Sequence, residues 1–314
     1  MKKNRELKMT VVSPGSSGNL GCGFDALGAA LEIKNSFIFK VRAGQKPGVK
    51  IKVSGCGKGV LPEDKRNAVW QSAVAIFHKV HFDYKNLLGV EIEAKNNIPL
   101  MRGLGSSASA RVAGAVFANE ISGGILEKKE LLKIVARLEG HYDNAAASLF
   151  GGITVTVPLL EGKERGIQVV LIKKGLKSCL VFAVPEFTVS TWKARKMLPK
   201  KYSAPDAIFN ISRAAALVDG LYKGALRPYM FEDRIHTPYR KKLIKGFESV
   251  RKKALEAGSL GVFISGSGSS VGAFASSRKN ALKIGRAMKK AFASAGVKSE
   301  ILITRISEKG ARVV

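Results

Sequence analysis

Apolar and polar residues alternate in several short segments of the chain, and this period of two predicts β-strands with one buried face. The first expected strand, residues 8–13, meets Pro14 and is expected to end there. Further strands are expected at 30–43, 49–55, 88–96, 153–160, 167–173, 178–185 and 300–306, with two short ones within 260–275. The pattern alone thus predicts a chain rich in strands.

Between these segments, apolar residues recur every three to four positions, which predicts helices. The expected helices cover 67–82, 107–121, 128–139, 141–150, 206–226, 239–257 and 280–295, and Asn67 is a suitable N-cap for the first. Strands and helices come in groups rather than in regular β-α-β alternation. This order predicts an α+β fold with antiparallel sheets, divided into residues 1–160 and 161–314.

The composition is that of a globular protein, because 46% of the 314 residues are apolar and 25% are charged. No apolar run approaches the ~18 residues that a membrane span needs. The N-terminal MKKNRELKMT is not followed by the apolar stretch of a signal peptide. Cys22, Cys56 and Cys179 are far apart and show no metal or redox spacing. We therefore expect a cytoplasmic protein without a membrane partner or a disulfide framework.

The charge is strongly positive: 53 Lys and Arg residues stand against 24 Asp and Glu, a formal net charge of +29. Such an excess points to polyanions, which include nucleic acids, anionic membranes and phosphorylated ligands. The densest clusters, at 195–201 and 239–253, are short, and the second has helical spacing with its lysines on the outer face. This favours a solvated basic surface without a single partner.

Three glycine- and serine-rich segments carry the candidate chemistry, at residues 13–28, 99–109 and 265–274. Glycine lets the backbone approach a ligand closely, and consecutive amides in a turn form a nest for an anion. The second segment also leads into a helix, whose first N–H groups attract phosphate. Neither a P-loop sequence nor the strand order of a dinucleotide-binding fold accompanies it. The three segments together therefore predict a phosphate site of another kind.

In order and spacing, these segments resemble the three motifs of the GHMP small-molecule kinase superfamily, and in detail those of its homoserine kinase family. SSGNLGCGFDALGAAL is similar to the first motif, PLMRGLGSSASA to the ATP loop and ISGSGSSVGAF to the third. EGHYDNAAASLFGG, STWKARKMLP and FEDRIHTPYR resemble further stretches of that family. The resemblance implies a ribosomal S5 domain 2-like N-terminal domain, a ferredoxin-like C-terminal domain, and ATP bound between them.

The activity that the resemblance implies is phosphorylation of the L-homoserine hydroxyl by ATP, in threonine biosynthesis, with Mg²⁺ as cofactor and a homodimer as the assembly. The ATP loop is expected to hold the phosphates through its backbone. Arg102 is either a charge at its rim or a solvated side chain, and Ser107 with Glu139 is expected to hold Mg²⁺. The loop comprises Pro99, Leu100, Met101, Arg102, Gly103, Leu104, Gly105, Ser106, Ser107, Ala108 and Ser109.

An amino-acid substrate presents an ammonium, a carboxylate and a hydroxyl. Asp25 is the expected partner of the ammonium and Asn19 a hydrogen-bond partner, although both residue types also cap turns. Two arginines are expected at the carboxylate, which guanidinium matches with two hydrogen bonds. These are Arg195 and Arg240, with Arg234 as the rival of the latter.

A compact polar set, His141, Asp143 and Asn144, precedes an alanine-rich helix. We expect His141 and Asn144 to position the substrate and Asp143 to be the candidate general base, with transition-state stabilisation as the alternative. Two other functions stay open at this point. One is another GHMP kinase, of the mevalonate pathway or acting on shikimate, and the other is a basic nucleic-acid-binding protein on the same fold. A low aromatic content, 7%, argues against nucleic acid.

Overall fold

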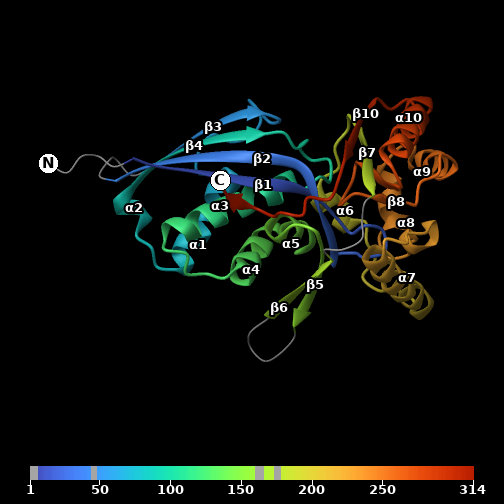
Figure 1. Ribbon diagram of the computed structural model, residues 1–314, viewed down its shortest axis with the longest axis horizontal. Coiled ribbons are helices and arrows are strands. Elements are labelled where there is room, and N and C mark those ends of the chain that lie inside the picture. The colour runs from blue at the N-terminus through green and yellow to red at the C-terminus, as the bar shows by residue number, and fades with distance from the viewer. Residues whose placement is uncertain (1–5, 44–47, 160–165, 173–177) are drawn as a thin grey trace.

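The computed structural model describes residues 6–43, 48–159, 166–172 and 178–314 (Figure 1). Residues 1–5 and the expected domain boundary between residues 160 and 161 lie outside this range. The strands are β1 (Glu6–Gly18), β2 (Leu27–Ala43), β3 (Gly48–Gly55), β4 (Leu88–Asn96), β5 (Ile153–Leu159), β6 (Gly166–Ile172), β7 (Cys179–Pro185), β8 (Gly261–Ile264), β9 (Val271–Ala275), β10 (Ser299–Thr304) and β11 (Arg312–Val313). The helices are α1 (Ala68–Lys79), α2 (Tyr84–Leu87), α3 (Ser106–Ile121), α4 (Lys128–Glu139), α5 (Asp143–Phe150), α6 (Thr191–Lys196), α7 (Ala204–Lys223), α8 (Thr237–Arg240), α9 (Phe247–Glu256) and α10 (Arg278–Ser294), with short 3-10 turns at Pro228–Phe231 and Lys241–Leu243.

Within the described residues, the first half of the chain, joined by β6 and the C-terminal β11, forms a seven-stranded sheet. Its order is β11-β1-β2-β4-β3, with β5 paired to the start of β2 and β6 paired to β5. Helices α1, α3, α4 and α5 cover one face of it (Figure 1). The apolar face of β2 packs there, and the rings of Phe39 and Phe117 stack 3.9 Å apart. The expectation of purely antiparallel sheets is wrong at one place, because β3 and β4 run parallel. The intervening α1 supplies the crossover that parallel neighbours need.

The second half forms a four-stranded antiparallel sheet in the order β10-β7-β9-β8. Numbered along this half, that order is 4-1-3-2, with α9 and α10 on one face, so the expected ferredoxin-like arrangement is confirmed. Side chains alternate across the sheet. Val181 and Ala273 face the helices, whereas Phe182 and Phe274 join a core that includes Leu20 of the first half. This shared core fixes the two halves against each other.

The pairing of β6 with β5 and of β11 with β1 bears on where the two domains divide. Both strands belong to the first sheet, although residues 166–172 and 312–313 lie beyond residue 160. Division into 1–160 and 161–314 stays a prediction, and these pairings favour a boundary after β6 rather than before it.

The first strand does not end at Pro14. It continues to Gly18 and pairs with β2 on both sides of a register shift between Pro14 and Ser16. A bulge tolerates a residue without an N–H, and this is why proline fits inside the strand. Residues 13–18 of the glycine–serine segment 13–28 are therefore strand, which places their backbone beside the other two segments.

Several helix limits also differ from expectation. The expected helix 239–257 is broken, because Gly246 adopts φ +85° and separates α8 and the turn after it from α9. Helix α7 ends at Gly224, which caps it in the left-handed conformation. Helix α5 begins at Asp143 rather than at 141. Helix α6, whose N-cap Ser190 accepts a hydrogen bond from the Lys193 amide, is short and was not expected.

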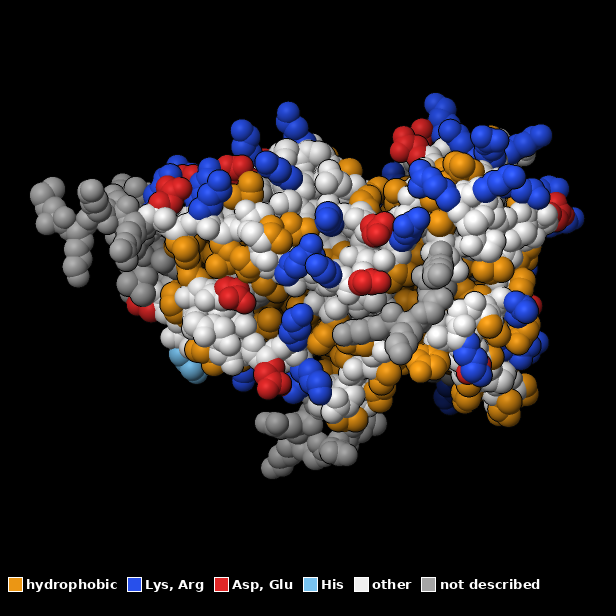
Figure 2. Space-filling model, viewed as in Figure 1, with side chains coloured by type: hydrophobic (Ala, Val, Ile, Leu, Met, Phe, Trp, Pro, Cys, Tyr) orange, Lys and Arg blue, Asp and Glu red, His pale blue; other side chains and the backbone are white. Residues whose placement is uncertain are grey.

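Figure 2 shows Lys and Arg side chains scattered over this face of both halves, with a concentration over α9 and α10. In the described part of the chain, no helix combines the length and the apolar character that crossing a membrane requires.

Candidate functional site

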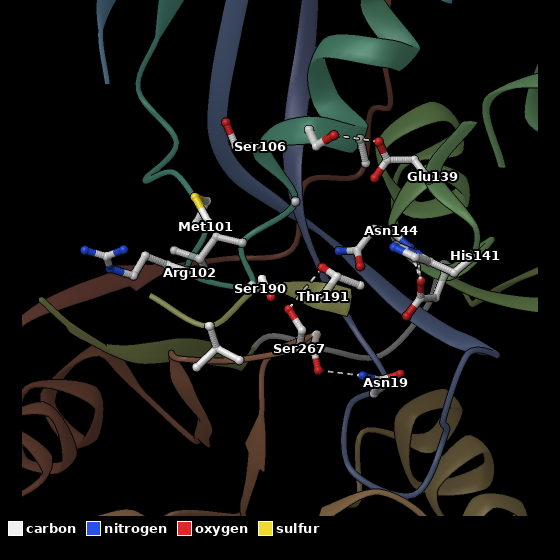
Figure 3. A pocket seen from close by; sticks show the side chains of 18 of the residues that line it. Asn19, Met101, Arg102, Ser106, Glu139, His141, Asn144, Ser190, Thr191 and Ser267 are labelled. Carbon is white, nitrogen blue, oxygen red and sulfur yellow. Dashed lines mark hydrogen bonds and ion pairs between the residues drawn. The ribbon is translucent and has the colours of Figure 1, made fainter. Parts of the chain in front are cut away.

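A pocket of about 240 Å³ lies between the two halves of the molecule (Figure 3). Its walls come from all three glycine–serine segments, from the start of α5 and from α6 and α8. Lining residues that the sequence singled out are Asn19, Asp25, Pro99, Met101, Arg102, Gly103, Leu104, Gly105, Ser106, Ser107, Ala108, Glu139, His141, Asp143, Asn144, Arg195 and Arg240. Of the expected site residues, Leu100 and Ser109 do not line it, and the Ser109 hydroxyl instead donates to the Ser13 carbonyl in the core.

The remaining walls were not named from the sequence as site residues. They are Val189, Ser190 and Thr191 before and at the start of α6, and Gly266 and Ser267 in the third segment. The stretch STWKARKMLP, whose likeness to a family motif was noted, contains the first turn of α6 and was the signal available for Ser190 and Thr191.

The second segment delivers the N-terminus of α3 into this pocket. Gly105 is the N-cap residue at φ +71°, and no side chain caps the helix. The first amide to bond back within the helix is that of Ser109, to the Gly105 carbonyl. The preceding amides, of Ser106, Ser107 and Ala108, belong to residues that line the pocket. Such amides, together with the helix dipole, form an anion site.

Hydrogen bonds join the three segments into one unit, and Ser265 is the central residue. Its hydroxyl donates to the Gly103 carbonyl at 2.6 Å and accepts from the Ser17 hydroxyl at 2.7 Å. The Gly266 amide donates to the Gly18 carbonyl at 3.1 Å. Residues more than 160 positions apart are thereby fixed around one cavity.

Arg102 lines the pocket and is partly exposed, but its guanidinium is hydrogen-bonded to backbone carbonyls. Its Nε donates to the Pro185 carbonyl at 2.7 Å, and its terminal nitrogens donate to the carbonyls of Glu186 and Leu100. Figure 3 shows the guanidinium directed away from the other labelled side chains. Arg102 therefore ties the ATP loop to the end of β7 instead of facing the pocket with its charge.

Ser107 and Glu139 meet at the opposite wall. The Ser107 hydroxyl donates to Glu139 Oε1 at 2.6 Å, and Arg111 Nε donates to the same oxygen at 2.6 Å. The Glu139 side chain is only 8% exposed. The described residues contain no cluster of three or more His, Cys, Asp or Glu side chains suited to a metal ion. The oxygens at this wall are thus one hydroxyl and one carboxylate, held by an arginine behind them.

Asp25 was expected to bind the ammonium of a substrate and Arg195 its carboxylate, and in the structure these two side chains pair with each other. Two hydrogen bonds of 2.8 and 2.9 Å join the carboxylate to the guanidinium. Asp25 stands at φ +55°, and its amide donates to Asn19 Oδ1 at 3.0 Å. Both side chains are about one-third exposed. The pair lies at the pocket wall with its charges accessible from the cavity.

Arg240 is 2% exposed, an uncommon position for a guanidinium. One terminal nitrogen donates to the Gly266 carbonyl at 3.0 Å, while Nε has no hydrogen-bond partner among the described residues. Burial, with the nearby charge of Arg195, lowers the pKa of Arg240. The rival, Arg234, is half exposed beside Asp206 and does not line the pocket. The structure therefore brings Arg240, and not Arg234, to the site.

Both asparagines are held by backbone. Asn19 donates from Nδ2 to the Gly266 carbonyl at 2.7 Å, and its Oδ1 accepts from the Asp25 amide. Asn144 donates from Nδ2 to the carbonyl and hydroxyl oxygens of Ser16 at 3.1 and 3.0 Å. With its amide nitrogen engaged, Asn144 offers its carbonyl oxygen as an acceptor.

His141 and Asp143 form a buried pair in which imidazole Nδ1 lies 2.7 Å from Asp143 Oδ1. Burial by itself would raise the pKa of Asp143, but the hydrogen bond and charge of His141 outweigh it and lower this pKa. Burial would likewise lower the pKa of His141, yet the hydrogen bond and charge of Asp143 raise it above 6.5. Each group thus stabilises the charged form of the other.

Replacing Asp143 by asparagine is expected to lower the pKa of His141, because burial then acts without its main opponent. NMR titration of the imidazole carbon-bound protons measures this directly. Glu139→Gln is the matched control, since Glu139 is a lesser cause of the raised pKa, and its shift should be smaller. An unchanged His141 pKa in Asp143→Asn would contradict the conclusion that Asp143 raises the pKa of His141.

The pair also has a defined effect on stability. The folded-state pKa of His141 is raised. The stabilisation that the His141–Asp143 pair gives the folded protein is therefore complete below pH 6.5 and is lost as pH rises through the folded-state pKa. The difference in unfolding free energy between wild type and Asp143→Asn should therefore narrow above that pKa, as urea unfolding over a pH series would show.

Comparison with known proteins adds independent information. Residues 67–152 match the family model of the GHMP kinases N terminal domain, and residues 217–294 match that of the GHMP kinases C terminal domain. The homoserine kinase of Clostridium acetobutylicum is 43% identical over 264 residues, which cover 82% of this chain and 84% of that protein. The homoserine kinase of Carboxydothermus hydrogenoformans is 39% identical over 308 residues, covering 96% and 95%.

Among solved structures, the homoserine kinase from Cytophaga hutchinsonii superposes with a TM-score of 0.84 at 32% identity, covering 100% of this chain and 98% of that one. Mevalonate kinase of L. major, at 17% identity, shares the fold with a TM-score of 0.68, covering 96% and 98%. The likeness to homoserine kinases thus extends along the whole chain, in sequence and in structure. The chain belongs to the homoserine kinase family of the GHMP kinases.

Proposed function

We propose that the protein transfers the γ-phosphoryl group of ATP to the hydroxyl of L-homoserine, giving O-phospho-L-homoserine and ADP. The observation that carries the proposal is one pocket that combines a helix N-terminus for phosphate with Asp25, Arg195 and the buried Arg240. The family relationship supports the same reaction.

The Asp25–Arg195 pair suits a zwitterion. A substrate with an α-ammonium and an α-carboxylate can take the place of each partner: the ammonium binds Asp25 and the carboxylate binds Arg195. One ion pair is exchanged for two, and neither the Asp25 nor the Arg195 charge is left unpaired. Arg240, whose Nε has no hydrogen-bond partner in the described part of the chain, provides a second guanidinium for the same carboxylate.

At the other end of the pocket, the ATP loop and the start of α3 would bind the phosphates. The Ser107 and Glu139 oxygens fit Mg²⁺, which uses one or two protein oxygens and completes its shell with phosphate and water. Bound there, the ion would neutralise charge on the phosphates during transfer. Arg111 keeps the Glu139 carboxylate in place.

Positioning, rather than proton abstraction by Asp143, accounts best for the rest of the site. Asp143 Oδ1 already accepts from His141 and from the Asn144 amide, and Oδ2 lies against Gly18. A carboxyl with a lowered pKa is also a weak base. In this proposal Asp143 orients His141, and His141 and Asn144 orient the hydroxyl of the substrate toward the γ-phosphate.

Asp143→Asn is therefore expected to reduce kcat by less than about tenfold, whereas loss of a general base removes about a hundredfold to ten-thousandfold. Steady-state assays at saturating ATP and homoserine measure this. His141→Gln provides the comparison, and it should raise KM for homoserine. A loss of kcat beyond about a hundredfold in Asp143→Asn, with an unchanged Tm, would restore Asp143 as the base.

ADP release measured with L-homoserine, mevalonate and shikimate tests the proposal as a whole. We expect turnover with homoserine alone, because the other two alcohols lack an ammonium and would leave Asp25 without a partner. 4-Hydroxybutanoate, which keeps the carboxylate and hydroxyl but lacks the ammonium, should be a poor substrate for the same reason. Turnover of mevalonate or shikimate without turnover of homoserine would move the protein to another branch of the superfamily.

The nucleic-acid alternative finds less support. Its motivation was the net charge of +29, but the basic side chains are scattered over both halves of the face in Figure 2, and the family relationship explains the pocket without it. Residence in the cytoplasm and assembly as a homodimer stay predictions. Gel filtration with light scattering tests the second.

A further inference from the structure

Phe24 contacts both arginines expected at the substrate carboxylate. It lies in the first glycine–serine segment, one residue before Asp25. The Cζ atom of Arg240 is 4.9 Å from the centroid of the Phe24 ring, and that of Arg195 is 5.9 Å away. Both distances lie within the range of cation–π attraction. Phe24 is not among the residues that line the pocket, so it acts on a ligand only through other side chains.

A fixed support lies against the ring. The imidazole of His236 stacks on Phe24 with centroids 5.2 Å apart and an interplanar angle of 30°. His236 is fully buried, and its Nε2 donates to the Gly21 carbonyl at 2.8 Å. Asp233 holds the backbone on this side, because its carboxylate accepts from the amides of residues 235, 236 and 237. The ring is thus supported by parts of the molecule that have little freedom to move.

The charges around the ring explain why such a support is useful. Arg195 and Arg240 repel each other. The Asp25 carboxylate attracts Arg240, but of the two arginines it is hydrogen-bonded only to Arg195. Burial lowers the pKa of His236, which favours the neutral imidazole and so disfavours a third cation beside the two guanidiniums. The electron-rich face of Phe24 is a group that attracts both arginines at once.

We propose that Phe24 is a positioning residue, whose ring holds Arg195 and Arg240 so that both converge on the α-carboxylate of the substrate. The inference rests on the proposed function, since it takes an α-carboxylate as the group that the two arginines bind. It adds a residue that touches neither substrate nor phosphate and yet decides how strongly the carboxylate is held.

The chain offers a matched control. Phe209 on α7 also lies under two guanidiniums, those of Arg213 at 3.6 Å and Arg234 at 4.1 Å from its centroid. None of these three residues lines the pocket. The same change at Phe209 therefore removes the same type of contact without affecting the site.

The experiment compares Phe24→Leu, Phe24→Tyr and Phe209→Leu with wild type, using L-homoserine and 3-aminopropan-1-ol as substrates. The second alcohol is homoserine without its carboxylate. In Phe24→Leu we expect KM for homoserine to rise about tenfold, with kcat and KM for ATP within about twofold of wild type. Activity with 3-aminopropan-1-ol should not change. Phe24→Tyr, which keeps the ring, and Phe209→Leu should both behave as wild type.

A separate readout follows the arginines themselves. The Nε–Hε NMR signals of Arg195 and Arg240 should carry a ring-current shift in wild type and Phe24→Tyr, and lose it in Phe24→Leu. Phe24→Met serves as a second ring-free variant should Phe24→Leu lower Tm markedly. These signals report the contact without substrate.

Equal losses with both alcohols, or the same loss in Phe24→Tyr as in Phe24→Leu, would show simple packing and overturn the inference. If the enzyme phosphorylates homoserine and Phe24→Leu behaves as wild type, the positioning role of Phe24 is overturned and the proposed function stands. A wild-type protein that does not phosphorylate homoserine would overturn both.

Discussion

Arg240→Gln is expected to raise KM for L-homoserine about a hundredfold or more, with little change in KM for ATP. Arg240 is 2% exposed, and among the described residues its only hydrogen-bond acceptor is the Gly266 carbonyl. A buried charge kept in this way is available to an anion. Removing one partner of a buried, hydrogen-bonded charge pair costs about 2–5 kcal/mol, much of it because the other charge is left unpaired. Glutamine keeps a donor for Gly266 but removes the cation.

The expected change is specific to the carboxylate. Arg240→Lys should recover only part of the affinity, because an ammonium cannot match a carboxylate with two parallel hydrogen bonds. Arg234→Gln, six residues earlier and half exposed, should leave both KM values unchanged. Since burial of Arg240 is itself unfavourable, as its lowered pKa indicates, Tm of Arg240→Gln should not fall. Wild-type KM for homoserine in Arg240→Gln would remove this residue from the substrate site.

Gly105→Ala is expected to weaken ATP binding about a hundredfold and to lower Tm. Gly105 has φ +71°, a conformation that costs an L-residue about 1–2 kcal/mol. In addition, a Cβ at this position would overlap the hydroxyl and backbone of Ser16 in β1. The start of α3 would have to move away from β1, and the amides that would bind phosphate would move with it. KM for ATP, together with calorimetric titration of ADP, measures the effect.

Gly124→Ala is the matched control for this prediction. Gly124 has φ +70°, close to that of Gly105, but apart from its chain neighbours no described residue has an atom within 4 Å of where its Cβ would be. The backbone strain is therefore the same, and the contact with Ser16 is absent. Gly124→Ala should lower Tm slightly and leave KM for ATP unchanged. Equal effects of the two substitutions on KM for ATP would show that close approach to β1 is unimportant.

Local sequence was sufficient where an element is held by its own periodicity. Strand β4 and helix α4 have the expected bounds, 88–96 and 128–139. It failed where pairing with another segment decides. Pro14 stays within β1 because β2 accommodates a bulge there, and the 239–257 region breaks at Gly246, whose left-handed backbone no apolar pattern reveals.

The candidate site shows the same division. The motifs identified 17 of the 22 residues that line the pocket, because the three segments together resemble those of a known family. They did not reveal that Arg102 is tied to the carbonyls of Pro185 and Glu186, or that Asp25 is paired with Arg195. Those partners lie 83, 84 and 170 positions away along the chain.

The sequence by itself determined the family, the α+β class and the types of group at the site, because these depend on residue identity and short-range spacing. Only the tertiary structure decided which of those groups meet. The shared core and the hydrogen bonds of Ser265 bring residues 17, 103 and 265, which are far apart in the sequence, to one cavity. The same packing buries Arg240 at the pocket, where Arg234 is absent, and pairs Asp143 with His141. Burial and electrostatic environment could not be predicted from the sequence, because they arise only when distant segments pack together.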